Sequence, residues 1–371
     1  MSAITPIVMP KWGLSMKEGT LTTWLVDEGA SIRVGQAIME VETDKIVGVV
    51  EAGDAGVLRR KVGAPGQTLP VKALLGVMAE PEVSEADIDA FVSGYVLPAE
   101  QDSEEEAAGS AYQFVDVDGI RVRYARRGNG ARHVLLLHGF GGDLDNWLFN
   151  IDALAEQHTA VALDLPGHGQ SDRTLPGATL PDLARFMARF LDALEIPSAH
   201  VVGHSLGGAI AAQMALDHLN RVDSVSLIAS AGLGEEINTG YTEGFVAAQS
   251  RRDLKPVVEQ LFAKPELVTR QLLDDVLKYK RLDGVSDLLS KLGGGLFAHG
   301  RQREQPGPQL GQTGKRVLVI WGAQDQVIPA RHAQGLPGEI RVHVLEGKGH
   351  MVHMEAASEV NRLLNDFFGA A

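Results

Sequence analysis

The chain has 371 residues, with 34 Lys and Arg against 48 Asp and Glu, and a formal net charge of −14 at pH 7. This charge argues against nucleic acid as a partner, because binding to phosphate backbones rests on clustered cationic side chains. The sequence has no cysteine, which excludes disulfides, a thiolate nucleophile and cysteine-ligated metals. It also has no apolar run near the ~20 residues of a membrane span. Together these features predict a cytoplasmic protein that is not held in a membrane.

Residues 1–80 are short apolar segments separated by glycine, and they contain an internal repeat. Gly19 and Leu21 recur 37 residues later as Gly56 and Leu58. Two equivalent halves of four short strands predict a small all-β domain, a pseudo-symmetric flattened barrel. Lys45 occupies the link between the halves, so we expect it at an exposed hairpin turn.

Residues 81–111 are predicted to be an acidic flexible linker, because the chain has no Lys or Arg between Lys72 and Arg121 and many carboxylates there. Such a composition buries little apolar surface, and like charges keep it extended. Apolar residues at helical spacing between Ile88 and Tyr95 allow two interpretations, a transient helix in a tether or a docking helix. The tether is preferred.

Residues 112–371 alternate apolar strands with helical segments. This alternation predicts an α/β domain with a mostly parallel sheet covered on both faces. Residues 233–314 interrupt the rhythm with helical patterns and are too long for a loop, so we expect a helical cap there. The predicted strands are 133–139, 159–167, 199–205, 224–230, 316–322 and 341–347.

Gly203-x-Ser205-x-Gly207 lies between a predicted strand and a predicted helix, which is the pattern of a nucleophile elbow. A serine hydroxyl is a weak nucleophile, so it needs a base and the base needs an orienting carboxylate. Asp325 and His350 follow later strands in the order that this fold requires. We therefore predict a catalytic triad of Ser205, Asp325 and His350.

The glycine-rich segment 138–142 (HGFGG) directly follows the first core strand. Its backbone geometry suits an oxyanion hole, for which we predict the amides of Phe140 and Leu206.

Other polar residues compete for these roles. His353 is a rival base, but it lies three residues into a probable helix and is better explained as a packing or surface residue. Asp164 and Asp172 precede the serine and are expected to brace loops. His200 and His204 have the spacing of metal ligands on a helix, yet they flank the elbow on strand and turn, and we predict no metal site.

Residues 41–45 (VETDK), set between the two half-repeats, resemble the attachment segment of lipoyl domains from 2-oxoacid and acetoin dehydrogenase complexes. This resemblance covers residues 4–79 and implies (R)-lipoate amide-linked to Lys45. Biotinyl domains share the fold but usually flank their lysine with methionines. The motifs HGFGG, DLPGHGQSD, GHSLGG, WGAQD and GKGH resemble the α/β-hydrolase family over residues 112–371.

The combination resembles the acetyltransferase components of acetoin dehydrogenase complexes in which a lipoyl domain is joined to an α/β-hydrolase domain. It implies transfer of an acetyl group from lipoyl-Lys45 to coenzyme A as co-substrate, by the triad predicted above. It also implies a homo-oligomer with two partner enzymes, a thiamine-diphosphate component that cleaves acetoin and a dihydrolipoamide dehydrogenase. Two alternatives stay open: a thioesterase or esterase with a lipoyl targeting domain, and a non-catalytic lipoyl carrier or scaffold.

Overall fold

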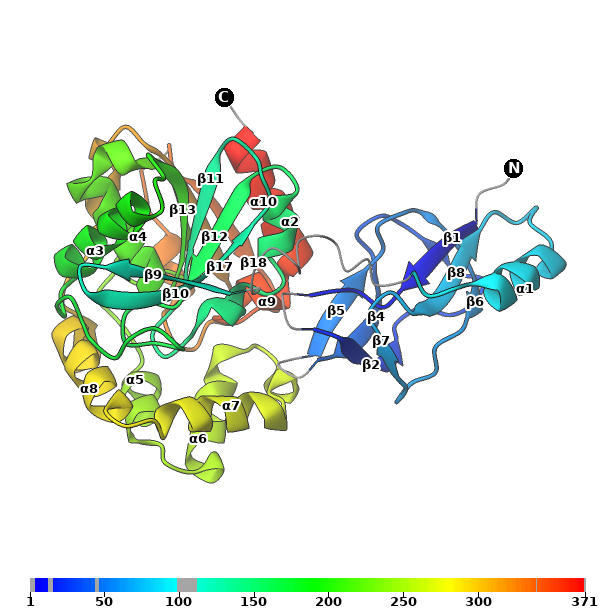
Figure 1. Cartoon of the computed structure of the whole chain (residues 1–371), viewed down its shortest axis with the longest axis horizontal. Coiled ribbons are helices and arrows are strands. Elements are labelled where there is room, and N and C mark those ends of the chain that lie inside the picture. Colours follow the sequence, from blue (N-terminus) through cyan, green and yellow to red (C-terminus); the bar gives the residue numbers. More distant parts are fainter. Residues whose placement is uncertain (1–3, 13–15, 44–46, 99–111, 338, 370–371) are drawn as a thin grey trace. The chain divides into compact units, whose positions relative to one another are not determined.

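The computed structural model describes residues 4–12, 16–43, 47–98, 112–337 and 339–369. The chain forms two compact units, Met1–Gly109 and Ser110–Ala371. Figure 1 shows the first unit as strands with one helix, and the second as a sheet flanked by helices. Among the described residues, no helix has the length and apolarity needed to cross a membrane.

The first unit is built from two four-stranded sheets, with strand orders β1-β8-β6-β3 and β5-β4-β2-β7. Advancing every strand number of the first sheet by four, and returning to β1 after β8, reproduces the second. The sequence repeat therefore folds as a pseudo-two-fold pair of sheets, which confirms the predicted lipoyl-type barrel. The strands are β1 (Ile4–Val8), β2 (Glu18–Trp24), β3 (Ser31–Ile32), β4 (Ala37–Glu42), β5 (Val47–Glu51), β6 (Gly56–Lys61), β7 (Thr68–Pro70) and β8 (Leu74–Ala79).

The core of the first unit uses equivalent residues of the two halves. The repeat mates Leu21 and Leu58 are both fully buried. Strands β4 and β5 pair antiparallel up to Glu42 and Val47. Lys45 falls in the connection between them and lies outside the described residues, so its position at a turn stays a prediction.

Helix α1 (Glu85–Gly94) packs on the first unit. The side chain of Ser84 caps its N-terminus, and the fully buried Ile88 joins an apolar cluster with residues of β8. Arg60 pairs with both Glu85 and Asp89, and Tyr95 donates a hydrogen bond of 2.8 Å to the carbonyl oxygen of Lys72, in the loop between β7 and β8. Residues 85–94 are therefore a helix packed on the first unit and not an extended tether, and the docking of a partner by this helix stays a prediction. Residues 99–111 lie outside the described residues.

The second unit has an eight-stranded sheet in the order β18-β17-β14-β13-β11-β12-β10-β9. All six predicted strands are present and pair in parallel with one another. The strands β9 and β10, which the sequence analysis did not identify, add an antiparallel hairpin at one edge. The strands are β9 (Gln113–Val117), β10 (Ile120–Arg127), β11 (His133–Leu137), β12 (Thr159–Leu163), β13 (Ala199–His204), β14 (Val222–Ile228), β17 (Arg316–Gly322) and β18 (Arg341–Leu345).

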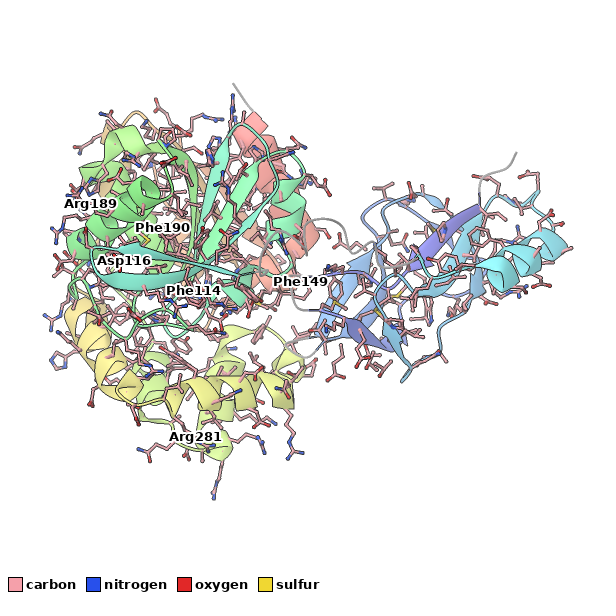
Figure 2. All side chains as sticks on the ribbon, viewed as in Figure 1. Phe114, Asp116, Phe149, Arg189, Phe190 and Arg281 are labelled. Atoms are coloured by element: carbon pink, nitrogen blue, oxygen red, sulfur yellow. The ribbon has the colours of Figure 1, made fainter. Side chains whose placement is uncertain are left out.

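Helices cover both faces of this sheet, with α3 and α4 on one side and α2 and α10 on the other (Figure 1). Figure 2 labels Phe190 of α3, which is fully buried and meets the ring of Tyr124 edge-on at 5.9 Å. The helices on the two faces confirm the prediction of a sheet covered on both sides. The helices are α2 (Ile151–Ala155), α3 (Leu180–Ala193), α4 (Leu206–Asp217), α9 (Val352–Glu355) and α10 (Ala357–Gly369).

The segment between β14 and β17 forms a cap of four helices and a small hairpin. Arg281, directly after the helix that ends at Lys280, is exposed, and Figure 2 shows it pointing outward. The cap elements are α5 (Thr239–Ala247), α6 (Arg251–Val258), α7 (Arg270–Lys280), α8 (Val285–Leu296), β15 (Phe297–Ala298) and β16 (Arg301–Gln302). Short 3-10 helices complete the unit at Leu144–Trp147, Leu219–Arg221, Glu259–Leu261, Pro265–Leu267, Gly307–Gln312 and Ala330–Ala333.

Candidate active site

Ser205 lies at the sharp turn that joins β13 to α4. Its φ angle is +52°, a left-handed conformation that is rare for a residue with a side chain. A Cβ on Gly203 would lie 2.1 Å from the carbonyl oxygen of Gly207, and a Cβ on Gly207 would lie 2.2 Å from that of Leu137. Both flanking positions therefore require glycine, which is the physical reason for the spacing in the sequence.

The glycine-rich loop 138–142 lies beside this turn. A Cβ on Gly139 would be only 3.0 Å from the Cβ of Ser205. Leu206 is the first residue of α4, so its N–H has no partner within the helix. Such an N–H favours a negative oxygen at the reacting centre. The loop bearing Phe140 and the helix bearing Leu206 thus meet at Ser205, and the oxyanion hole stays a prediction for these two amides.

Asp325 follows β17 and His350 follows β18, and a hydrogen bond joins their side chains. His350 Nδ1 lies 2.8 Å from Asp325 Oδ2, and the two side chains are 1% and 0% exposed. A neutral imidazole that donates through Nδ1 has Nε2 free to accept a proton. The pair is therefore arranged as an oriented base, in two loops that are 25 residues apart in the chain.

His204 holds the loop of His350 next to the elbow. Its Nε2 lies 3.0 Å from the backbone oxygen of His350, and the two rings are 4.7 Å apart. Burial lowers the pKa of His204 well below its usual range, so the ring is neutral and gives its single N–H to this carbonyl. Because His204 and Ser205 are neighbours in the chain, the bond draws the histidine loop toward the serine.

The other candidates have structural partners instead. Asp164 is fully buried, pairs with Arg123 at 3.2 Å and accepts the backbone N–H groups of Leu144 and Gln170. Asp172 accepts the backbone N–H of Arg121. Both carboxylates brace loops, as the sequence analysis proposed. His200 bonds to the hydroxyl of Ser224 and stacks on Phe368, away from the turn bearing His204.

The cap covers the site with aromatic side chains of α5. Tyr241 donates a hydrogen bond of 3.3 Å to the backbone oxygen of Phe140, and its ring lies 6.5 Å from that of His350. Phe245 lies against the Phe140 ring at 6.1 Å. Ser205 itself is 6% exposed. The cap therefore shields the reacting side chains from bulk water, which the helical pattern of the cap alone did not reveal.

Glu355 is a further site residue that the sequence analysis missed. One carboxylate oxygen accepts the N–H of Gly349, directly before His350, at 2.8 Å, and the other accepts the N–H of Ala263 in the cap at 3.1 Å. Burial raises the pKa of Glu355. The side chain thus connects the histidine loop to the cap. Its separation from Ala263 in the chain left no local signal for this contact.

His353 is fully buried between the rings of Trp147 and His204. Burial, helped by the nearby His350, lowers its pKa to about 3. In the unfolded chain a histidine has a pKa of about 6.5. Below pH 6.5, His353 binds a proton in the unfolded chain but stays neutral in the folded protein. The free energy of unfolding is therefore not reduced by His353 above pH 6.5, and it declines as the pH falls toward 3.

We therefore expect His353→Phe to flatten the acid side of the stability curve. Replacing the ring by a non-titrating one should reduce the loss of unfolding temperature between pH 7 and pH 5, measured by calorimetry on the full chain. The same change at the partly exposed His218 serves as the control. An unchanged acid slope in His353→Phe would show that this histidine is not the source of the loss.

Two family models match the chain. One is described as alpha/beta hydrolase fold and matches residues 132–357. The other is described as biotin-requiring enzyme, of the biotin/lipoyl type, and matches residues 5–78. The two matches fall within the two compact units of the structure.

Some relatives match over nearly the whole chain. The chain is 62% identical over 366 residues to the dihydrolipoyllysine-residue acetyltransferase component of the acetoin cleaving system of Cupriavidus necator, covering 99% of this chain and 98% of that protein. The chain belongs to this acetyltransferase family. The component of the same name from Pseudomonas putida is 48% identical to the chain described here, over 99% of both chains.

The second unit of the acetyltransferase is also similar to hydrolases. A 2-hydroxy-6-oxononadienedioate/2-hydroxy-6-oxononatrienedioate hydrolase of Paraburkholderia phymatum is 32% identical over 71% of this chain and 97% of its own. Among solved structures, a meta-cleavage product hydrolase from Pseudomonas fluorescens is 26% identical with a TM-score of 0.62, covering 69% of this chain and 97% of that one.

Proposed function

We propose that this acetyltransferase moves an acetyl group from a dihydrolipoyl group on Lys45 to coenzyme A through acetyl-Ser205. The observation that carries the proposal is the Asp325–His350 hydrogen bond of 2.8 Å, held beside a strained serine turn. An oriented imidazole next to a serine is the arrangement that makes its hydroxyl a nucleophile. Membership of the family supports the acetyl thioester as the substrate.

The first unit suits a covalent lipoyl group. Its barrel, its pseudo-symmetry and its match to the biotin/lipoyl model support Lys45 as the attachment site, at the link between β4 and β5. When bound as an amide on Lys45, lipoate would supply, once its disulfide is reduced, a thiol that carries the acetyl group as a thioester. Tethering the thioester to the same chain raises its effective concentration at the serine.

In the first half-reaction, His350 Nε2 takes the proton of Ser205 while Oγ attacks the thioester carbonyl. A bond forms between Oγ and the carbonyl carbon. The thioester oxygen becomes negatively charged and accepts hydrogen bonds from the backbone N–H groups of Phe140 and Leu206. Asp325 stabilises the imidazolium through Nδ1. When the carbon–sulfur bond breaks, His350 returns the proton to the leaving thiol and acetyl-Ser205 is formed.

In the second half-reaction, the thiol of coenzyme A gives its proton to His350 and attacks acetyl-Ser205. The oxygen of Ser205 leaves and recovers that proton, so acetyl-CoA is released and the site is restored. Water would make acetate by the same route. The low exposure of Ser205 and His350, under Tyr241 and Phe245 of the cap, supports transfer to a thiol in preference to hydrolysis.

Family membership also supports the proposed partners. A thiamine-diphosphate enzyme that cleaves acetoin would load the lipoyl group with acetyl. A dihydrolipoamide dehydrogenase would reoxidise the dithiol after transfer. We further propose that the acetyltransferase assembles as a homo-oligomer on which these enzymes gather.

The products of a single turnover test the proposed function. Lipoylated, acetylated protein is mixed with or without coenzyme A, and acetyl-CoA and acetate are followed by mass spectrometry. We expect acetyl-CoA to be the main product with coenzyme A, and acetate to form slowly without it. Acetate formed at one rate in both conditions would instead identify a lipoyl-targeted thioesterase.

That thioesterase is the second candidate function, and the hydrolase relatives of the second unit favour it. It would use the same serine, histidine and aspartate with water in place of coenzyme A. The non-catalytic carrier is less favoured, because a chain without catalysis has no need for a buried Asp325–His350 pair.

A further inference from the structure

The carboxylate of Asp325 is fully buried, and each of its oxygens accepts two N–H groups. Oδ1 accepts the backbone N–H groups of Val327 at 2.8 Å and Ile328 at 3.0 Å. Oδ2 accepts His350 Nδ1 at 2.8 Å and Trp321 Nε1 at 3.0 Å. Among the described residues, Trp321 is therefore the one side chain besides His350 that donates to this carboxylate.

Trp321 is fully buried near the end of β17, four residues before Asp325. Its strand pairs with β14 on one side and β18 on the other, so the indole has little freedom to move. The N–H is also 3.2 Å from the carbonyl oxygen of Ile328, which closes the turn around the carboxylate. The ring thus supplies a fixed donor from rigid structure, whereas the two backbone donors come from the turn itself.

We propose that Trp321 is a positioning residue for the acid–base pair of Asp325 and His350. This inference rests on the proposed function, because it takes those two residues as the base and its orienting group. The indole N–H holds Oδ2 in the direction of His350 Nδ1 and shares the negative charge of that oxygen. The indole N–H therefore sets the orientation of the His350 imidazole. It also sets how strongly the Asp325 carboxylate stabilises the protonated form of that imidazole.

Two consequences follow from removing this donor. Asp325 keeps its two backbone donors on Oδ1 but loses the fixed direction of Oδ2, so His350 meets Ser205 in the correct orientation less often. The negative charge on Oδ2 is also less shared, so the imidazolium is held more strongly and keeps its proton to a higher pH. A ring that only fills space would produce neither effect.

The test compares Trp321→Phe with Trp147→Phe in the lipoylated full chain. Both tryptophans are fully buried in the second unit, but the indole N–H of Trp147 has no hydrogen-bond partner among the described residues. The two variants therefore lose similar apolar surface and differ in the lost hydrogen bond. We measure acetyl transfer from acetyl-dihydrolipoamide to coenzyme A as a function of pH.

For Trp321→Phe we expect kcat to fall about tenfold with little change in KM, and the acidic limb of the pH profile to move up by roughly one pH unit. Trp147→Phe should keep the wild-type limb. Equal pH profiles for the two variants would overturn the proposal, even if both lose rate or stability.

A second measurement separates this inference from the proposed function. The low-field proton resonance of the His350–Asp325 hydrogen bond reports the pair without any turnover. It should shift in Trp321→Phe and stay in place in Trp147→Phe, and an unshifted resonance in Trp321→Phe would overturn the positioning role. Failure of the proposed function appears elsewhere, as acetyl transfer that survives the loss of Ser205.

Discussion

Ser205→Ala is expected to lower the single-turnover rate of acetyl-CoA formation by a factor of ~10⁴ or more. The change removes one buried oxygen at the strained turn and leaves the Cβ, the glycine neighbours and the Asp325–His350 pair in place. The thioester then has no nucleophile to accept its acetyl group. Residual transfer would come from coenzyme A attacking directly in the oxyanion hole.

Ser226→Ala is the matched control for this experiment. Ser226 is fully buried on β14, next to the strand that ends at the elbow, and its hydroxyl has no partner among the described residues. We expect this variant to keep the wild-type rate of transfer. Full activity in Ser205→Ala would contradict an acetyl-serine intermediate and leave direct attack by coenzyme A as the mechanism.

Lys45→Arg is expected to abolish lipoylation and, with it, all turnover that depends on the protein-borne acetyl group. Arginine keeps the positive charge but its guanidinium does not form the amide. Intact-mass measurement should show the unmodified chain, and coupled acetyl-CoA formation should be absent. Transfer from free acetyl-dihydrolipoamide should persist, because the second unit is unchanged. Exposed Lys17→Arg is the control and should stay lipoylated.

Mixing the two variants asks whether the lipoyl group serves its own chain or a neighbour. Ser205→Ala has a carrier without a nucleophile, and Lys45→Arg has a nucleophile without a carrier. Turnover in an assembled mixture, when neither variant works alone, would show transfer between chains. A silent mixture, with Ser205→Ala lipoylated and both variants folded, would restrict transfer to a single chain.

The sequence predicted those features whose physical cause is local. The glycine at 203 is required by a contact with the backbone of Gly207, within the same turn, and the six parallel strands follow from apolar runs of strand length. The repeat in residues 1–80 predicted two related sheets, because equivalent sequences bury equivalent residues such as Leu21 and Leu58. None of these conclusions needed knowledge of distant contacts.

Helix α1 shows where local reasoning failed. Acidic composition favoured an extended tether, since like charges repel in an isolated segment. In the folded unit, Arg59 and Arg60 of β6 face Glu85 and Asp89, and Ile88 packs on the sheet. Charges that repel along the chain are therefore compensated by cations that lie about 25 to 29 residues away.

By itself, the sequence thus determined the two folds, the serine turn and the set of candidate acids and bases, because each has a recognisable pattern of residue types along the chain. Only the tertiary structure decided that His350, and not His353, bonds to Asp325. It also revealed the support of that pair by Trp321 and Glu355. These contacts depend on how strand ends and the cap meet in space, and spacing along the chain does not encode that meeting.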